Sequence, residues 1–103
     1  MEYISTRNKK ETYLFKDVFL KGLAPDGGLF IPKNIPFFSH EELTKFNNLS
    51  YNELASKIIL KFCEDEFNVK EIKEIINSSY KNFRTQNVVE IVKLNELNIL
   101  ELF

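Results

Sequence analysis

Apolar residues recur at helical spacing in three stretches of the chain, and each stretch follows a residue type that caps helices. Ser39 and Ser50 are each followed three residues later by a glutamate, and Asn68 has Glu71 at the same distance. In such a capping box the cap side chain and the glutamate bond free backbone N–H groups at the helix start. The two later stretches carry apolar stripes of Tyr51, Leu54, Ala55, Ile58, Ile59, Phe62 and Cys63 and of Val69, Ile72, Ile75, Ile76, Tyr80 and Phe83. These patterns predict three helices.

The N-terminal part combines two short strands with one short helix. Residues 3–6 predict a strand, and residues 29–31 predict another. Between them, residues 15–21 place apolar side chains at helical spacing, and Gly22 suits the positive φ of a helix C-terminal cap. Residues 24–28 (Ala-Pro-Asp-Gly-Gly) are typical of a tight turn, because proline fixes one φ angle and glycine accepts positive φ.

The C-terminal part predicts a hairpin. Residues 88–94 are rich in β-branched side chains, residues 95–98 read as a short turn, and residues 99–103 read as a second strand. A terminal strand with a row of exposed apolar side chains would tend to associate with other chains, and natural domains rarely end in this way. We therefore expect further chain to follow in the intact protein. Together the patterns predict one α+β domain over residues 1–103, in which a small sheet of short strands packs with about four helices.

Composition and charge argue against two classes of partner. Hydrophobic residues make up 44% of the chain and charged residues 28%, with a net charge of −1. Only two arginines are present, so there is no basic field that would bind a nucleic-acid backbone. No apolar run approaches the roughly 20 residues that cross a membrane. Because the single cysteine cannot form an internal disulfide and Met1 begins no apolar leader, we expect a cytoplasmic protein.

Residue types that often carry catalysis are present, but their surroundings favour structural roles. His40 is the single histidine, and it has no partners at the spacing of a metal site or a catalytic triad. Cys63 lies on an apolar stripe and is expected in the core. The acidic run at residues 64–66 is expected to be solvated. None of the twelve lysines has the apolar surroundings that lower the pKa of a Schiff-base lysine.

Two polar segments remain as candidates for a binding site. Ser5-Thr6-Arg7 groups two hydroxyls and a guanidinium at a strand end, an arrangement that can bind an anion. The alternative for this segment is an ordinary polar loop. In Asp26-Gly27-Gly28 the two glycines allow the backbone to approach another surface or a ligand closely. The alternative here is a tight turn with no further role.

The same two segments resemble the opening of threonine synthase. That family has Y-x-S-T-R-G, a short helix, and then G-L-A-P-D-G-G-L-Y/F-x-P. This chain has Tyr3-Ile4-Ser5-Thr6-Arg7 and, over residues 22–32, Gly-Leu-Ala-Pro-Asp-Gly-Gly-Leu-Phe-Ile-Pro. The second motif is long and specific, whereas the first is short and supportive. Asn8 stands where the family usually has glycine, and asparagine tolerates positive φ better than most residues.

The resemblance implies a pyridoxal-phosphate enzyme that converts O-phosphohomoserine and water to threonine and phosphate. This chain would be its N-terminal domain, with Ser5-Thr6-Arg7 and Asp26-Gly27-Gly28 as loops that face the substrate. In the family a pair such as Leu102-Phe103 leads into H-G-P-T-x-A-F-K-D, whose lysine bonds the cofactor. That segment is not in this sequence. We therefore expect the chain alone to bind no cofactor and to be inactive, with the missing pyridoxal-phosphate domains as its partners.

A hypothesis from another class is a free-standing interaction module that derives from this domain and has no catalytic part. It predicts a stop codon after residue 103 and a monomer or a defined dimer. The fragment hypothesis predicts instead an exposed apolar surface that includes residues 99–103.

Overall fold

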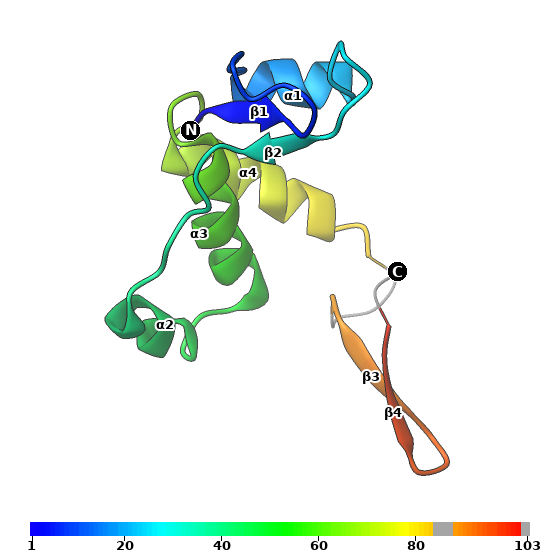
Figure 1. Ribbon diagram of the computed structural model, residues 1–103. Coiled ribbons are helices and arrows are strands. Elements are labelled where there is room, and N and C mark those ends of the chain that lie inside the picture. Colours follow the sequence, from blue (N-terminus) through cyan, green and yellow to red (C-terminus); the bar gives the residue numbers. More distant parts are fainter. Residues whose placement is uncertain (84–87, 102–103) are drawn as a thin grey trace.

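The computed structural model describes residues 1–83 and 88–101, and it has the predicted α+β fold (Figure 1). The elements in chain order are β1 (Tyr3–Ser5), α1 (Phe15–Lys21), β2 (Phe30–Pro32), α2 (His40–Phe46), α3 (Tyr51–Cys63), α4 (Val69–Tyr80), β3 (Glu90–Leu94) and β4 (Leu97–Glu101). The strands form two antiparallel pairs, β1 with β2 and β3 with β4. The β3–β4 pair is the predicted C-terminal hairpin, and it forms a sheet separate from the β1–β2 pair.

The β1–β2 pair fastens the N-terminal segment to the helices. Ser5 lies opposite Phe30 in the antiparallel register. On the other edge of β1, Tyr13 and Tyr3 exchange two backbone hydrogen bonds of 2.9 Å. The hydroxyl of Tyr3 donates to the carbonyl oxygen of Phe62 over 2.8 Å, which joins the strand to α3. All three residues of β1 are buried as a result.

The three predicted capping boxes are confirmed. Ser39, Ser50 and Asn68 each accept a hydrogen bond from the backbone of the glutamate three residues later, and each glutamate accepts one from the backbone of its cap. These local bonds satisfy donors that a helix start leaves free. α1 has no side-chain cap of this kind. Its first turn is stabilised instead by a residue far away in the sequence: the carboxylate of Glu66 accepts a hydrogen bond from the backbone N–H of Lys16 over 3.0 Å.

The core lies where α3 and α4 pack together. Cys63, Ile72 and Ile76 form its buried centre. The partly buried residues that pack against this centre are Phe15, Ala55, Leu60, Phe67 and Tyr80. Cys63 is a core residue, as predicted, and burial raises the pKa of its thiol. Each apolar stripe is wider than the face that is covered, since Ile75 is 51% exposed and Ile59 38% exposed.

α2 buries no residue of its own and is tied to α3 by Lys61. The ammonium group donates to the carbonyl oxygen of Phe37 over 3.0 Å and to the carboxylate of Glu42 over 3.2 Å. It also lies 4.5 Å from the ring centre of Phe38. The pKa of Glu42 is lowered to about 2, first because the backbone N–H of Ser39 donates to the carboxylate and then because Lys61 does. These polar contacts add to the apolar packing of α2, in which the rings of Phe46 and Phe38 meet edge to face at 5.2 Å.

The C-terminal hairpin is present, but its turn is shorter than predicted. Leu94 pairs with Leu97, so the loop consists of Asn95 and Glu96 alone and β4 begins two residues before the predicted strand at residue 99. Asn95 has a φ of 55°. A two-residue hairpin loop requires positive φ, and asparagine accepts it more easily than other non-glycine residues. Figure 1 shows the hairpin standing apart from the helices.

Candidate functional site

The structure brings the two predicted candidate segments together. The β1–β2 register places the residues that follow Ser5 beside those that precede Phe30. Thr6 and Leu29 meet at this point: the backbone N–H of Thr6 donates to the carbonyl oxygen of Leu29 over 2.9 Å, and the backbone N–H of Leu29 donates to the Thr6 hydroxyl over 3.0 Å. The loop after β1 and the turn before β2 therefore form a single cluster.

The carboxylate of Asp26 is the centre of this cluster. The hydroxyl of Ser5 donates to its Oδ1 over 2.7 Å, and the backbone N–H of Gly28 donates to the same oxygen over 2.8 Å. These bonds hold the pKa of Asp26 below its ordinary value, the Ser5 bond having the largest effect and the Gly28 bond the next. Ser5 is 1% exposed, and its oxygen also accepts from the backbone N–H of Arg7 over 3.1 Å.

The two glycines have different roles in the turn. The N–H of Gly27 donates to the carbonyl oxygen of Ala24 over 2.9 Å, which closes the turn, and Gly27 has a φ of 75°. Gly28 is needed for space, because a Cβ there would lie 2.3 Å from the Ser5 hydroxyl oxygen and 3.0 Å from the Thr6 hydroxyl oxygen. The close backbone approach that the sequence suggests is thus an approach to the chain's own first strand.

Arg7 reaches over the turn from the loop after β1. Its Nη1 donates to the backbone carbonyl oxygen of Asp26 over 3.1 Å. A Cβ on Gly27 would lie 3.1 Å from the same Nη1, so the absence of a side chain there leaves room for the guanidinium. Arg7 is exposed. All six predicted site residues belong to the cluster, and their role toward a substrate stays a prediction.

The pH dependence of the cluster follows from the lowered pKa of Asp26. The ionised carboxylate accepts both hydrogen bonds, so its contribution to stability is present above the ordinary value of 3.8 and is lost as the pH falls through the lower folded value. We expect the amide proton shift of Gly28, followed by NMR, to titrate with a midpoint below 3.8. The D26N variant should show no such transition, and a midpoint at or above 3.8 in the unmodified chain would contradict the geometry.

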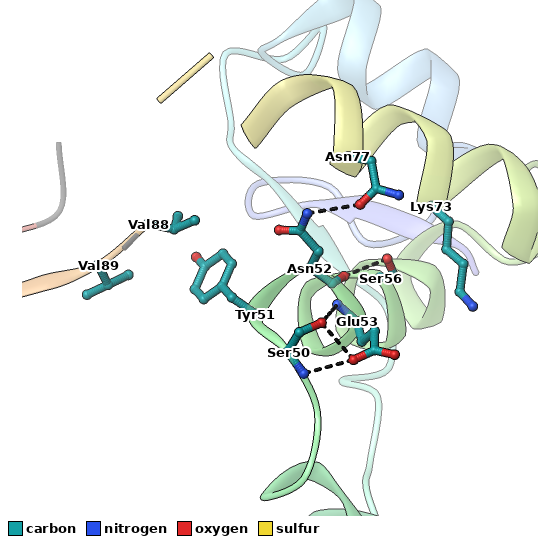
Figure 2. A pocket seen from close by; sticks show the side chains of 9 residues that line it. All are labelled: Ser50, Tyr51, Asn52, Glu53, Ser56, Lys73, Asn77, Val88 and Val89. Carbon is teal, nitrogen blue, oxygen red and sulfur yellow. Dashed lines mark hydrogen bonds between the residues drawn. The ribbon is translucent and has the colours of Figure 1, made fainter. Parts of the chain in front are cut away.

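A cavity that the sequence did not indicate opens beside the start of α3. It has a volume of about 680 Å³ and is lined by Ser50, Tyr51, Asn52, Glu53, Ser56, Lys73, Asn77, Val88 and Val89 (Figure 2). Asn52 Nδ2 donates to Asn77 Oδ1 over 2.9 Å across the two helices. The Ser56 hydroxyl donates to the carbonyl oxygen of Asn52 over 2.7 Å. Asparagines on two helices carry no recognisable spacing, so no sequence signal points to this cavity.

The described residues do not by themselves fit pyridoxal phosphate. A lysine that bonds the cofactor must be desolvated or otherwise have its pKa lowered. No lysine among residues 1–83 and 88–101 is buried. Lys61 is the least exposed of them, and its ammonium is already bonded to Glu42 and Phe37. His40 is exposed at the first position of α2.

The described part of the chain has neither a cluster of metal-binding side chains nor a helix that could cross a membrane. Within residues 1–83 and 88–101, no three acidic, histidine or cysteine side chains gather in a way that could hold a metal ion. In the same residues, each helix is too short or too polar to cross a membrane.

Comparison with known proteins identifies the family. The family described as threonine synthase N terminus matches residues 2–80. Threonine synthase of Pseudomonas aeruginosa is 38% identical over 104 residues, which cover 100% of this chain and 22% of that protein. Human threonine synthase-like 2 is 35% identical over 105 residues, again 100% of this chain and 22% of the relative.

The fold agrees with these relatives. The crystal structure of pyridoxal-phosphate-bound threonine synthase from Brucella melitensis matches with a TM-score of 0.87 and 33% identity, covering 100% of this chain and 22% of that one. The chain thus spans about a fifth of the length of the curated relatives that it matches. Because both the sequence motifs and the fold agree over its length, the chain belongs to the threonine synthase family and corresponds to the N-terminal domain of those enzymes.

Proposed function

We propose that this chain is the N-terminal part of an active threonine synthase, which converts O-phosphohomoserine and water to threonine and phosphate. The observation that carries the proposal is the match of the whole chain, at 38% identity, to a threonine synthase. The family also includes proteins named threonine synthase-like, so membership alone leaves the reaction to be tested. We further propose a cytoplasmic location. The single cysteine, which cannot form an internal disulfide, and the similarity to threonine synthases support this location.

Within that enzyme we assign pyridoxal phosphate to residues outside this chain. The cofactor supplies the carbanion chemistry when bound, and the protein supplies binding and orientation. No lysine in the described part of the chain has the buried setting that the cofactor bond requires. The part proposed for this chain is the cluster of Ser5, Arg7 and Asp26, which presents a rigid polar surface to the rest of the enzyme.

Exposed apolar side chains support the inference that this domain packs against other parts of a larger protein. On α1, Phe19 is 76% exposed and Leu20 82% exposed. Both faces of the β3–β4 hairpin carry such residues, among them Ile91 at 70% and Leu97 at 68% exposure. Isolated two-stranded hairpins are at best marginally stable in water. We propose that the pyridoxal-phosphate domains of the same enzyme cover these surfaces.

The fragment hypothesis expected this exposed surface to include the end of the chain. Ile99 and Leu100 are 43% and 54% exposed. Residues 102–103 of the predicted final strand lie outside the described residues. The surface fits the proposal, because contiguous exposed apolar patches mark sites where other protein packs.

The first experiment is to read the encoding DNA beyond codon 103 and to assay the product of the whole reading frame. We expect a frame that continues through His-Gly-Pro-Thr and a downstream Lys-Asp, and a product that releases phosphate from O-phosphohomoserine. The 103-residue chain, incubated with pyridoxal phosphate and borohydride, should retain no label on a specific lysine. A stop codon after residue 103 would refute the proposal in favour of the free-standing interaction module.

A further inference from the structure

Five of the six cluster residues build the turn, and their polar groups are engaged within it. The Ser5 hydroxyl donates to Asp26 and its oxygen accepts from the Arg7 backbone. The Asp26 carboxylate accepts from Ser5 and from the backbone of Gly28. The Thr6 oxygen accepts from Leu29. These bonds make a scaffold whose only positively charged group is Arg7.

The guanidinium of Arg7 is held in place by backbone groups. One nitrogen donates to the carbonyl oxygen of Asp26, and the main chain of Arg7 is tied to the buried Ser5 hydroxyl. Among residues 1–83 and 88–101, no carboxylate lies within ion-pair distance of Arg7. Since a guanidinium offers several N–H donors in a planar fork, most of them remain available to a partner.

The geometry of the turn preserves this arrangement. Gly27 lacks the Cβ that would press on Nη1 at 3.1 Å. The bonded oxygen of Asp26 faces Ser5 and Gly28, and the arginine contacts the carbonyl oxygen of that residue instead. The charge of Arg7 is therefore positioned by the turn without a direct bond to the Asp26 carboxylate. An exposed arginine with an anchored guanidinium and free donors is suited to an oxyanion, because two parallel N–H groups can bond two oxygens of a carboxylate or of a phosphate.

We propose that Arg7 binds the phosphate group of the substrate in the assembled enzyme, an inference that rests on the proposed function. O-phosphohomoserine carries two kinds of oxyanion, a carboxylate and a phosphate monoester. The phosphate carries the larger charge at neutral pH and has three acceptor oxygens. It therefore gains more than the carboxylate from a guanidinium that has several free donors.

The test uses the product of the whole reading frame, as the wild type and as the variants R7Q, R7K and K10Q. Lys10 belongs to the same exposed loop, so K10Q makes the same charge change as a matched control. Phosphate release from O-phosphohomoserine gives KM and kcat. The rise in melting temperature on adding inorganic phosphate, compared with L-homoserine, which has the carboxylate but no phosphate, gives binding without turnover.

We expect R7Q to raise KM by roughly 10- to 100-fold with a smaller change in kcat. Its melting temperature should no longer respond to inorganic phosphate, while K10Q should behave like the wild type. R7K keeps the charge without the fork and should be intermediate, and it serves if R7Q does not fold.

Three outcomes would go against the inference or its basis. An unchanged KM in R7Q or R7K, with a lower melting temperature in the absence of phosphate, would show that Arg7 has a structural role only and would overturn the inference alone. A lost response to L-homoserine with a retained response to phosphate would assign Arg7 to the carboxylate and overturn it as well. A wild type without phosphate release would overturn the proposed function, and with it the assignment of the substrate.

Discussion

Replacing Gly28 with alanine is expected to destabilise the chain by about 3 kcal/mol, at the upper end of the usual effect of overpacking. The added Cβ would lie 2.3 Å from the Ser5 hydroxyl oxygen and 3.0 Å from Asp26 Oδ1 and the Thr6 hydroxyl oxygen. Ser5 is buried and cannot turn away without losing its bonds to Asp26 and to the Arg7 backbone. Urea unfolding of the 103-residue chain, followed by far-UV circular dichroism, would measure the loss.

Gly22 provides the matched control for this prediction. It has a φ of 71°, but a Cβ there would meet nothing within 4 Å. The G22A variant should therefore lose about 1–3 kcal/mol through backbone strain alone, since its φ of 71° and ψ of −53° lie in a sparsely populated region. Combining each variant with S5A separates the causes, because S5A removes the clashing oxygen. We expect a coupling energy of about 1 kcal/mol or more between S5A and G28A and near zero between S5A and G22A. Additive effects in both pairs would contradict the close approach.

Replacing Ile76 with alanine should destabilise the chain by about 3–4 kcal/mol, which is a large part of the stability of a domain of this size. Ile76 is 4% exposed and lies in the buried centre between α3 and α4, next to Cys63 and Ile72. Truncation removes apolar contacts and leaves a cavity that helices joined by a short loop can close only in part. The same urea unfolding measurement applies, read at the midpoint with the slope compared between variants.

The neighbouring residue makes a sharp control for the core. Ile75 is chemically identical to Ile76 and occupies the same helix, but it is 51% exposed. I75A should therefore change the free energy of unfolding by less than about 1 kcal/mol in the isolated chain. Equal losses in I75A and I76A would mean that α4 does not present this face to α3.

These two experiments probe separate parts of the molecule. The Gly28 variants test the cluster that holds Arg7, and the Ile76 variants test the packing of α3 on α4. The Tyr3 hydroxyl bond to Phe62 joins the two parts. If the cluster positions Arg7 as proposed, G28A in the whole enzyme should impair substrate binding more than I76A does at equal loss of stability.

The elements whose stabilising contacts lie within a few residues can be predicted from the amino-acid sequence alone. The caps at Ser39, Ser50 and Asn68 bond glutamates three residues away, so their pattern predicts the helix starts directly. Gly22 likewise ends α1 with the positive φ expected of it. The family motifs over residues 3–32 identified the family for a related reason, since they record a tight turn and a strand end in a short stretch.

Contacts between distant segments become evident only in the folded structure. The hydrogen bond from Ser5 to Asp26 spans 21 residues, and no local spacing indicates that the two candidate segments form one cluster. Nor does any local pattern show that a side chain at position 28 would collide with the Ser5 hydroxyl. The same holds for which residues of each apolar stripe are buried, because periodicity identifies a face but the packing of α3 on α4 selects Ile76 over Ile75. The predicted hairpin turn is two residues longer than the observed one, because the register of β3 with β4 and the positive φ of Asn95 set its length. Contacts between distant residues depend on the path of the whole chain, and that path is fixed only when the elements pack.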